Sequence, residues 1–237
     1  MLPVAILAGG LATRLGPLTE KLPKALIPIE GEPFVVHQLR LLRKNGAERV
    51  ILCVGHFGQL IEQAVGDGRA FGLRVEYAYD GPSLLGTAGA IRSAMPKLGT
   101  CFFVMYGDSY LECDYALVAS EFARSGKLGL MTVFRNEGEW DSSNVEFEDG
   151  RILAYSKKEK TSRMRFIDYG LGVFRAEAFA SIPLADLADV YAELLRTGQL
   201  AAVEVHQRFY EIGSRAGLQE MTKLLSSRRG GRGVSPA

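Results

Sequence analysis

The sequence contains few cysteines, almost no excess charge and no long uninterrupted apolar segment. Its three cysteines, Cys53, Cys101 and Cys113, have no CxxC or metal-ligand spacing. Because their number is odd and their spacing is irregular, neither a disulfide framework nor a cysteine-based metal site organises this chain. We expect all three to be buried packing thiols in a reducing compartment.

The charge balance and the lack of apolar spans exclude two further classes of protein. Lys and Arg number 28 and Asp and Glu number 27, so the net charge of +1 gives no global field that attracts nucleic acid or a membrane surface. The start MLPVAILAGG lacks the basic and long apolar regions of a secretory signal, and no apolar run approaches the ~20 residues that span a bilayer. We therefore expect a cytoplasmic protein with no nucleic-acid partner and no membrane partner. The composition leaves open whether it is a monomer or a homo-oligomer.

Short apolar runs alternate with segments of helical spacing in the first half of the 237-residue chain. The apolar runs are PVAIL at residues 3–7, RVILCV at 49–54, LRVEYAY at 73–79 and CFFVMY at 101–106. Apolar residues with helical spacing lie between them, near residues 35–42, 60–65 and 88–94. This alternation predicts right-handed βαβ units, a largely parallel sheet and a single α/β domain.

The second half changes character after about Gly126. LGLMTVF, NVEFEDGRILAY and IDYGLGVF supply strands with fewer helices between them, which predicts a small mixed extension of the sheet. Asp149-Gly150 separates two alternating runs and favours a hairpin with a type I′ turn. A helix near residues 186–196, a strand near 201–205 and a helix near 217–225 should follow. Residues 227–237 lack apolar periodicity and are expected to form a disordered tail.

A segment with glycines and basic residues follows the first expected strand. In LAGGLATRLGPLTEKLPKALIPI, the small residues Ala8, Gly9 and Gly10 allow backbone amides to approach an anion closely. Arg14 and Lys24 add positive charge to the same segment. Because ligands of open α/β sheets collect at the carboxyl ends of the strands, this segment is the first candidate for a phosphate site.

Two common phosphate motifs do not account for this segment. Ala12 stands where the second glycine of GxGxxG would fall, and GxxxxGK[ST] is absent. With Gly9-Gly10, Thr13-Arg14 and Pro23-Lys24, the segment closely resembles the LAGGxGTRL…PK signature of the sugar-phosphate nucleotidyltransferase family. The compact length is most similar to the family's heptose-1-phosphate guanylyltransferases and N-acetylmuramate-1-phosphate uridylyltransferases.

This resemblance implies both a fold and a reaction. The fold is a single Rossmann-like three-layer α/β domain with a mostly parallel central sheet, the GT-A-like nucleotidyltransferase fold, over residues 1–226. The reaction joins a nucleoside triphosphate and a sugar 1-phosphate, with Mg²⁺ as cofactor, and releases pyrophosphate. Arg14 and Lys24 would hold the phosphates that leave, and Asp108 completes the expected catalytic set.

The resemblance also implies a nucleotide site. LLGTAGAI at residues 84–91 resembles the family's loop over the base, and Asp80 precedes it where relatives often have a carboxylate or amide. An alternative interpretation of this loop is a helix start capped by Thr87. The expected nucleotide-binding residues are Leu7, Ala8, Gly9, Gly10, Thr13, Asp80, Leu85, Gly86 and Thr87.

Two separated acidic residues resemble the family's metal ligands. In MYGDSYL, Asp108 directly follows an apolar strand, although aspartate is also a frequent turn former and helix cap. FYEIGSRAGL resembles the family's DIGT segment with Glu211 in place of the aspartate. Glutamate still offers an oxygen ligand to Mg²⁺, but its extra methylene changes its reach.

The expected acceptor site departs from the family pattern. ILAYSKKEK at residues 152–160 occupies the position of a Glu-Lys pair, whose lysine contacts the sugar phosphate. The Glu-Lys pair can be aligned either with Ser156-Lys157 or with Lys157-Lys158. In both alignments the lysine is present, but the glutamate is missing. A solvated strand end is the alternative. The expected sugar-phosphate-binding residues are Tyr106, Gly107, Asn144, Lys157, Lys158, Asp168 and Gly170.

Two other functions remain open at this stage. A regulatory domain could bind a nucleotide-sugar without catalysis, although Arg14, Lys24 and Asp108 argue against that function. A cytidylyltransferase for a small phosphorylated alcohol such as phosphocholine could use the same loop and metal site. The sequence fixes neither the base nor the acceptor.

Overall fold

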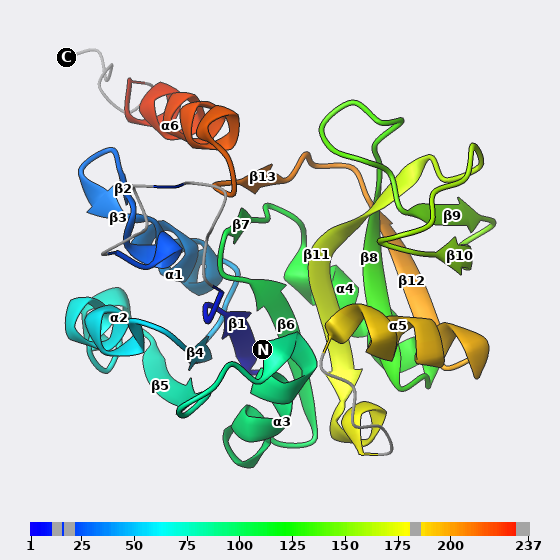
Figure 1. The fold of residues 1–237 in the computed structure, drawn as a ribbon, viewed down its shortest axis with the longest axis horizontal. Helices are drawn as coiled ribbons and strands as arrows, with labels where there is room; N and C mark the ends of the chain where they lie inside the picture. The colour runs from blue at the N-terminus through cyan, green and yellow to red at the C-terminus, as the bar shows by residue number, and fades with distance from the viewer. Residues whose placement is uncertain (11–15, 17–21, 181–185, 231–237) are drawn as a thin grey trace.

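The computed structural model describes residues 1–10, 16, 22–180 and 186–230, which form a three-layer α/β arrangement (Figure 1). The strands of the main sheet are β1 (Val4–Leu7), β4 (Arg49–Val54), β5 (Arg74–Tyr79), β6 (Cys101–Tyr106), β8 (Gly129–Arg135), β9 (Val145–Glu148), β10 (Arg151–Tyr155), β11 (Phe166–Arg175) and β12 (Leu200–Val205). The two small sheets pair β2 (Pro28–Ile29) with β3 (Glu32–Pro33) and β7 (Ser109–Tyr110) with β13 (Tyr210–Glu211). The helices are α1 (Phe34–Lys44), α2 (Gly58–Val65), α3 (Gly86–Leu98), α4 (Tyr115–Ser125), α5 (Leu187–Arg196) and α6 (Arg215–Gly230). Short 3₁₀ turns are η2 (Lys24–Leu26), η3 (Arg69–Phe71) and η4 (Ala176–Phe179).

The centre of the sheet is parallel. Its strands run in the order β6-β1-β4-β5, and every neighbouring pair among them is parallel. Strands buried on both faces favour continuous apolar runs, and VAIL, VILCV and CFFVM are buried almost completely. The expected α/β fold with a mostly parallel central sheet is confirmed.

The helices cover the two faces of the sheet in separate groups. One apolar cluster joins α1, α2 and α4 to the sheet, through side chains such as Leu39, Ile61 and Phe122. The other cluster joins α3 and α5 to the opposite face, through Ile91 and Tyr191 among others. In Figure 1, α5 lies in front of the sheet and α4 lies behind it.

The strand order reverses at β1. The chain runs from β1 outward through β4 to β5, and then returns through α3 to place β6 on the other side of β1. In the register of this pair, Leu7 lies opposite Tyr106. The carboxyl ends of β1 and β6 therefore form a topological switch point, where open α/β sheets bind their ligands.

The second half adds the expected mixed extension. β11 runs antiparallel to β6, β8 and β9, whereas β12 and β8 are parallel. The hairpin between β9 and β10 turns at Asp149 and Gly150, which have φ values of 48° and 75°. Both angles match the positive φ values of a type I′ turn, so the predicted hairpin is confirmed.

The expected start of the tail at residue 227 is wrong, because α6 continues to Gly230. Ser226 Oγ donates to Glu30 Oε1 at 2.7 Å, and Arg228 forms an ion pair with Glu112. These long-range polar contacts stabilise the end of a helix that apolar periodicity alone does not reveal. Residues 231–237 lie outside the described part of the chain.

The cysteines and helices agree in part with the expectations from composition. Cys53 and Cys113 are buried free thiols, and burial raises the pKa of each to about 12. Cys101 is also free but is only partly buried, which corrects the expectation for that residue. Among the described residues, no helix combines the length and the apolar character needed to span a membrane.

Candidate active site

Two cavities meet at the carboxyl edge of the parallel strands. The first, which we call the nucleotide cavity, has a volume of about 230 Å³. Backbone and small side chains from the ends of β1 and β6 and from the start of α3 form most of its wall. Its lining residues are Leu7, Ala8, Gly9, Gly10, Lys24, Ala25, Cys53, Asp80, Leu84, Gly86, Thr87, Ala90, Tyr106, Gly107 and Asp108.

The second cavity, which we call the acceptor cavity, has a volume of about 610 Å³. Charged and polar side chains from the mixed extension form most of its wall. Its lining residues are Lys24, Tyr106, Asp108, Asp141, Ser142, Asn144, Lys157, Lys160, Ile167, Asp168, Gly170, Glu211 and Gly213. The two cavities therefore share Lys24, Tyr106 and Asp108.

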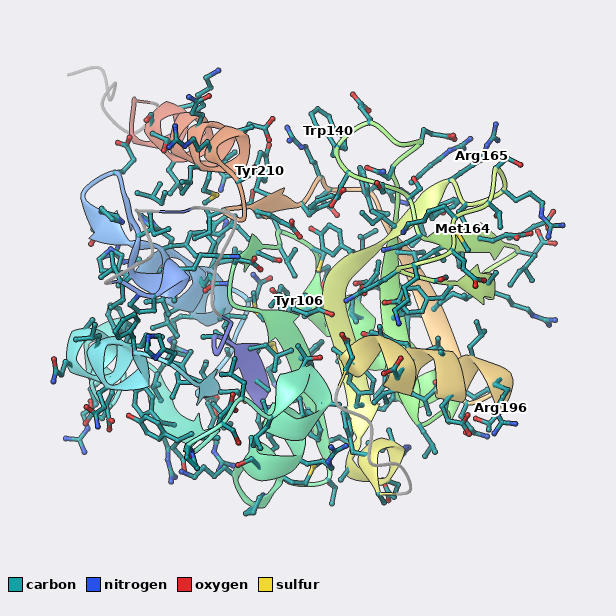
Figure 2. The ribbon with its side chains drawn as sticks, in the orientation of Figure 1. Tyr106, Trp140, Met164, Arg165, Arg196 and Tyr210 are labelled. Atoms are coloured by element: carbon teal, nitrogen blue, oxygen red, sulfur yellow. The ribbon has the colours of Figure 1, made fainter. Side chains whose placement is uncertain are left out.

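The shared wall contains an ion pair beside a tyrosine. Lys24 Nζ donates to Asp108 Oδ2 at 2.7 Å, and both side chains remain partly exposed to the cavities. Figure 2 shows Tyr106 near the middle of the molecule, at the boundary between its two halves. Burial and the surrounding carboxylates raise the pKa of Tyr106 well above its ordinary value, so its hydroxyl stays protonated.

A glycine allows the Asp108 turn to approach β1. Gly107 N donates to Leu7 O at 2.9 Å. A Cβ at this position would lie 2.7 Å from Leu7 O and 2.9 Å from Ala8 Cα, both of which are backbone atoms. The close approach therefore requires glycine, and it brings the Asp108 carboxylate to the switch point between β1 and β6.

Glu211 reaches the same place through strand pairing. β13 pairs antiparallel with β7, so Glu211 lies opposite Ser109, and Ile212 N donates to Asp108 O at 2.9 Å. Ser109 Oγ lies 3.5 Å from Glu211 Oε1. Burial of the carboxylate group raises the pKa of Glu211 to about 7, and the negative charges of Asp108 and Asp141 add to this effect. The Glu211 side chain nevertheless remains accessible from the open acceptor cavity.

These carboxylates suit a hard divalent cation. Asp108, in the turn before β7, and Glu211, on β13, face one cavity, and the charge of Asp108 helps to raise the pKa of Glu211, so a bound cation would stabilise the ionised form of Glu211. Mg²⁺ is often held by only one or two carboxylates together with substrate phosphates and water. Among the described residues, no group of three or more acidic, histidine or cysteine side chains could hold a metal ion. The residues present therefore fit Mg²⁺.

The base side of the nucleotide cavity is built by close backbone packing. A Cβ added to Gly9 would lie 3.2 Å from Asp80 Oδ2, and a Cβ added to Gly55 would lie 3.1 Å from the same oxygen. The Asp80 carboxylate accepts from the backbone N–H of Leu85, and burial raises the pKa of Asp80. Leu84 lines the cavity, whereas Leu85, expected from the sequence, does not line it and contacts the site only through its backbone N–H, which holds Asp80.

Thr87 does not cap its own helix. The residue before α3 is Leu85, and no side chain caps this helix start. Instead, Thr87 Oγ1 accepts from Leu187 N at 2.7 Å and lies 3.3 Å from Asp186 Oδ1. The alternative interpretation of Thr87 as a cap of the 84–91 segment is therefore wrong, because its hydroxyl joins α3 to the start of α5.

The structure distinguishes the neighbouring lysines by position. Lys157 Nζ donates to Tyr106 OH at 3.1 Å and lines the acceptor cavity. Lys158 is exposed and does not line either cavity. Lys160, which the motif comparison missed, also lines the acceptor cavity, and burial lowers its pKa. The run of three lysines within residues 157–160 was the available signal for Lys160.

The carboxylate of Asp168 is held deep in the acceptor cavity. Asn144 Oδ1 accepts from Asp168 N at 2.8 Å, and Gly170 N donates to Asp168 Oδ1 at 3.0 Å. Burial raises the pKa of Asp168, while the charge of Lys157 acts in the opposite direction. Gly170 has a φ of 96° at an irregularity in the pairing of β11 with β8, which accounts for the glycine.

A loop that the sequence motifs did not identify completes this cavity. Asp141 and Ser142 precede Asn144, and Asn136 Nδ2 donates to Asp141 O at 2.6 Å. The Arg208 guanidinium lies 3.3 Å from the ring centroid of Trp140 and 4.7 Å from that of Tyr210. In Figure 2, Trp140 and Tyr210 lie toward the top of the molecule, Trp140 on the loop between β8 and β9 and Tyr210 on β13. This stacking holds the loop against the strand of Glu211.

Five expected site residues have a different outcome. Gly107, expected in the acceptor site, lines the nucleotide cavity instead. Leu85 and Lys158 line neither cavity. Thr13 and Arg14 lie outside the described residues. The other members of the expected set line one cavity or both.

Comparison with known proteins connects this geometry to a family. The family model described as nucleotidyl transferase matches residues 4–216. UTP–glucose-1-phosphate uridylyltransferase of Synechocystis sp. is 28% identical over 229 residues, which cover 88% of this chain and 59% of that protein. N-acetylmuramate alpha-1-phosphate uridylyltransferase of Neisseria meningitidis is 28% identical over 235 residues, which cover 92% and 96%. The chain thus spans about three fifths of the length of relatives such as the first.

Solved structures agree on the fold. HddC from Yersinia pseudotuberculosis superposes with a TM-score of 0.80 at 23% identity, covering 95% of this chain and all of that chain. A Bacillus anthracis structure in complex with a sucrose gives a TM-score of 0.85 at 19% identity, covering 100% and 98%. These identities support a shared fold and no more. Because the family model covers most of its length, the chain belongs to the nucleotidyl transferase family.

Proposed function

We propose that this protein joins a nucleoside triphosphate and a sugar 1-phosphate, forming a nucleoside diphosphate sugar and releasing pyrophosphate. One observation carries the proposal: a small cavity lined by backbone and a larger cavity lined by lysines and carboxylates share Lys24, Tyr106 and Asp108. Two phosphorylated substrates, one in each cavity, would meet at this shared wall.

The reaction needs no nucleophilic side chain. An oxygen of the sugar phosphate attacks the α-phosphorus, and the bond from this phosphorus to the oxygen bridging the α- and β-phosphates breaks. The difficulty is to bring two polyanions together in line, so positioning and neutralisation of charge supply most of the catalysis. Lys24 would turn from Asp108 to the leaving phosphates, and Lys157 would hold the acceptor phosphate.

The acidic residues serve the cofactor and the sugar. Asp108 and Glu211 would hold Mg²⁺, which when bound neutralises the phosphates and orients them. Asp168 would accept hydrogen bonds from sugar hydroxyls and so replace the glutamate that is missing beside Lys157. Asp80 would accept from an N–H group of the base, because a carboxylate offers only acceptors.

A screen of purified protein tests the proposal. Five nucleoside triphosphates are combined with a panel of sugar 1-phosphates and with phosphocholine, and pyrophosphate release is measured with and without Mg²⁺. We expect release with at least one sugar 1-phosphate, and only when Mg²⁺ is present. Release with phosphocholine alone would instead favour the phosphorylated-alcohol enzyme, and binding without release would favour a regulatory domain. The cytoplasmic location stays a prediction.

A further inference from the structure

Gln38 is a buried polar residue that the proposed reaction does not use. It lies on α1 and has no exposed surface. Its amide Nε2 donates to Tyr106 O at 3.2 Å and to Ser109 O at 2.8 Å. These two carbonyls flank Gly107-Asp108, so one side chain from a distant helix joins both ends of the turn that carries Asp108.

The orientation of this amide is fixed by its partners. Both partners are carbonyl oxygens, so only the NH₂ group of Gln38 can face them. Its Oε1 is buried and has no hydrogen-bond partner within the described chain. A buried acceptor without a partner destabilises a fold, and an apolar side chain at this site would avoid that cost. The benefit of glutamine therefore lies in the turn that it holds.

Helix α1 also contacts the segment of Lys24, which forms the ion pair with Asp108. Phe34 N donates to Ile27 O at 3.0 Å, and His37 Nε2 donates to Ile29 O at 2.9 Å. Both acceptors lie shortly after Lys24 along the chain. α1 thus contacts the segment of Lys24 through its first turn and the turn of Asp108 through Gln38.

We propose that Gln38 is a positioning residue that holds the Gly107-Asp108 turn, so that the Asp108 carboxylate faces Glu211 in the geometry that binds a divalent cation. This inference rests on the proposed function. The link to Glu211 is direct, because Asp108 O accepts from the backbone N–H of Ile212, the residue that follows Glu211. Without the amide, two buried carbonyls lose their donor and the turn relaxes, which moves Asp108 relative to Glu211.

Binding of Mn²⁺ measures this role without catalysis. In Gln38→Met, which keeps the length of the side chain, Mn²⁺ binding followed by electron paramagnetic resonance should weaken by about 10- to 100-fold, as for other partners that orient metal ligands. The concentration of Mg²⁺ that half-activates pyrophosphate release should rise in parallel. The KM values for both substrates at saturating Mg²⁺ should stay within about twofold of wild type, since neither cavity is lined by Gln38.

A matched variant separates positioning from a loss of stability. Thr132 is also fully buried, and its Oγ1 donates to Leu171 O at 2.6 Å, in a bond between β8 and β11 that involves no residue of the Asp108 turn. Thr132→Val removes this bond with little change of shape and should lower Tm without changing Mn²⁺ affinity. If Gln38→Met does not fold, Gln38→Asn replaces it, because the shorter amide cannot reach both carbonyls.

The outcomes are distinguishable. Weaker Mn²⁺ binding in the folded Gln38 variant, with unchanged binding in Thr132→Val, supports the inference. Wild-type Mn²⁺ affinity in a folded Gln38 variant overturns it, even if Tm falls. If the wild-type protein binds Mn²⁺ but releases no pyrophosphate with any substrate pair, the proposed function fails, whereas the Mn²⁺ comparison still decides the role of Gln38.

Discussion

The nucleotide cavity and the acceptor cavity are built in different ways. The nucleotide cavity is lined mainly by backbone and small residues at the ends of parallel strands, and three of its glycines lie just after β1 or β6. The acceptor cavity is more than twice as large and is lined by charged side chains from six separate segments of the chain. The first is fixed by close packing of the sheet, and the second depends on loops and on long side chains. The closely packed nucleotide cavity suits recognition of a constant triphosphate, and the acceptor cavity with its long side chains suits selection among acceptors.

The largest effect is expected where the two cavities meet. Asp108→Asn keeps the size of the side chain but removes its charge. Because Asp108 lines both cavities, the substitution should disturb the sites for both substrates. We expect kcat to fall by about 10²- to 10³-fold, as for other removed electrostatic contacts to a reacting group. Asp149→Asn is the matched control, because this exposed turn residue tolerates asparagine at its positive φ. An equal loss in the control, or full activity in Asp108→Asn, would contradict the assignment.

Lys24→Ala should have opposite effects on turnover and on metal binding. Loss of a contact to the leaving phosphates should lower turnover by about 10- to 100-fold. Removal of the positive charge 2.7 Å from Asp108 Oδ2 should tighten Mn²⁺ binding, by roughly threefold or more. Pyrophosphate release and electron paramagnetic resonance report the two effects. Lys44→Ala, at an exposed position on α1, should change neither, and weaker Mn²⁺ binding in Lys24→Ala would refute this account.

Two glycines test how the nucleotide cavity is built. In Gly107→Ala the new methyl group would clash with the backbone of β1, and unfolding by urea should show a loss of about 1–3 kcal/mol. In Gly10→Ala the methyl group meets no atom of the described residues within 4 Å, so stability should be retained. Because Gly10 lines the nucleotide cavity, the KM for the nucleotide should rise. Equal stability of the two variants would argue against close packing at the switch point.

The acceptor cavity is tested by neighbouring lysines. Lys157→Ala should raise the KM for the acceptor by about tenfold while leaving the KM for the nucleotide unchanged, because the ammonium lies on the acceptor side. Lys158→Ala is the control, since this exposed lysine lines neither cavity. Steady-state kinetics with each substrate varied in turn make the measurement. A larger effect in Lys158→Ala would indicate that Lys158, and not Lys157, contacts the acceptor phosphate.

The difference between the cavities also explains how much could be predicted from the sequence. Residues 7–10 and Asp108 were identifiable because they lie at or just after the end of a buried apolar strand, and parallel strands end at one edge of a sheet. Asp141 and Gln38 belong to no motif, and Lys160 belongs to the lysine motif without matching the family pattern, since the positions of these residues depend on contacts with residues distant in sequence. The alternative interpretation of Thr87 as a helix cap is wrong for the same reason, because its partner Leu187 is 100 positions away.

By itself, the sequence determined the alternation of strands and helices, the hairpin at Asp149-Gly150 and the chemistry of the motif after β1. These features depend on local periodicity, on the backbone freedom of particular residues and on charge, all of which the chain carries wherever it folds. Only the tertiary structure decided that Glu211 lies beside Asp108, that Lys157 rather than Lys158 faces the acceptor cavity, and that Gln38 holds the turn between β6 and β7. Each of these depends on strand pairing or packing across the whole chain, where the direction of a side chain is set by its neighbours in space.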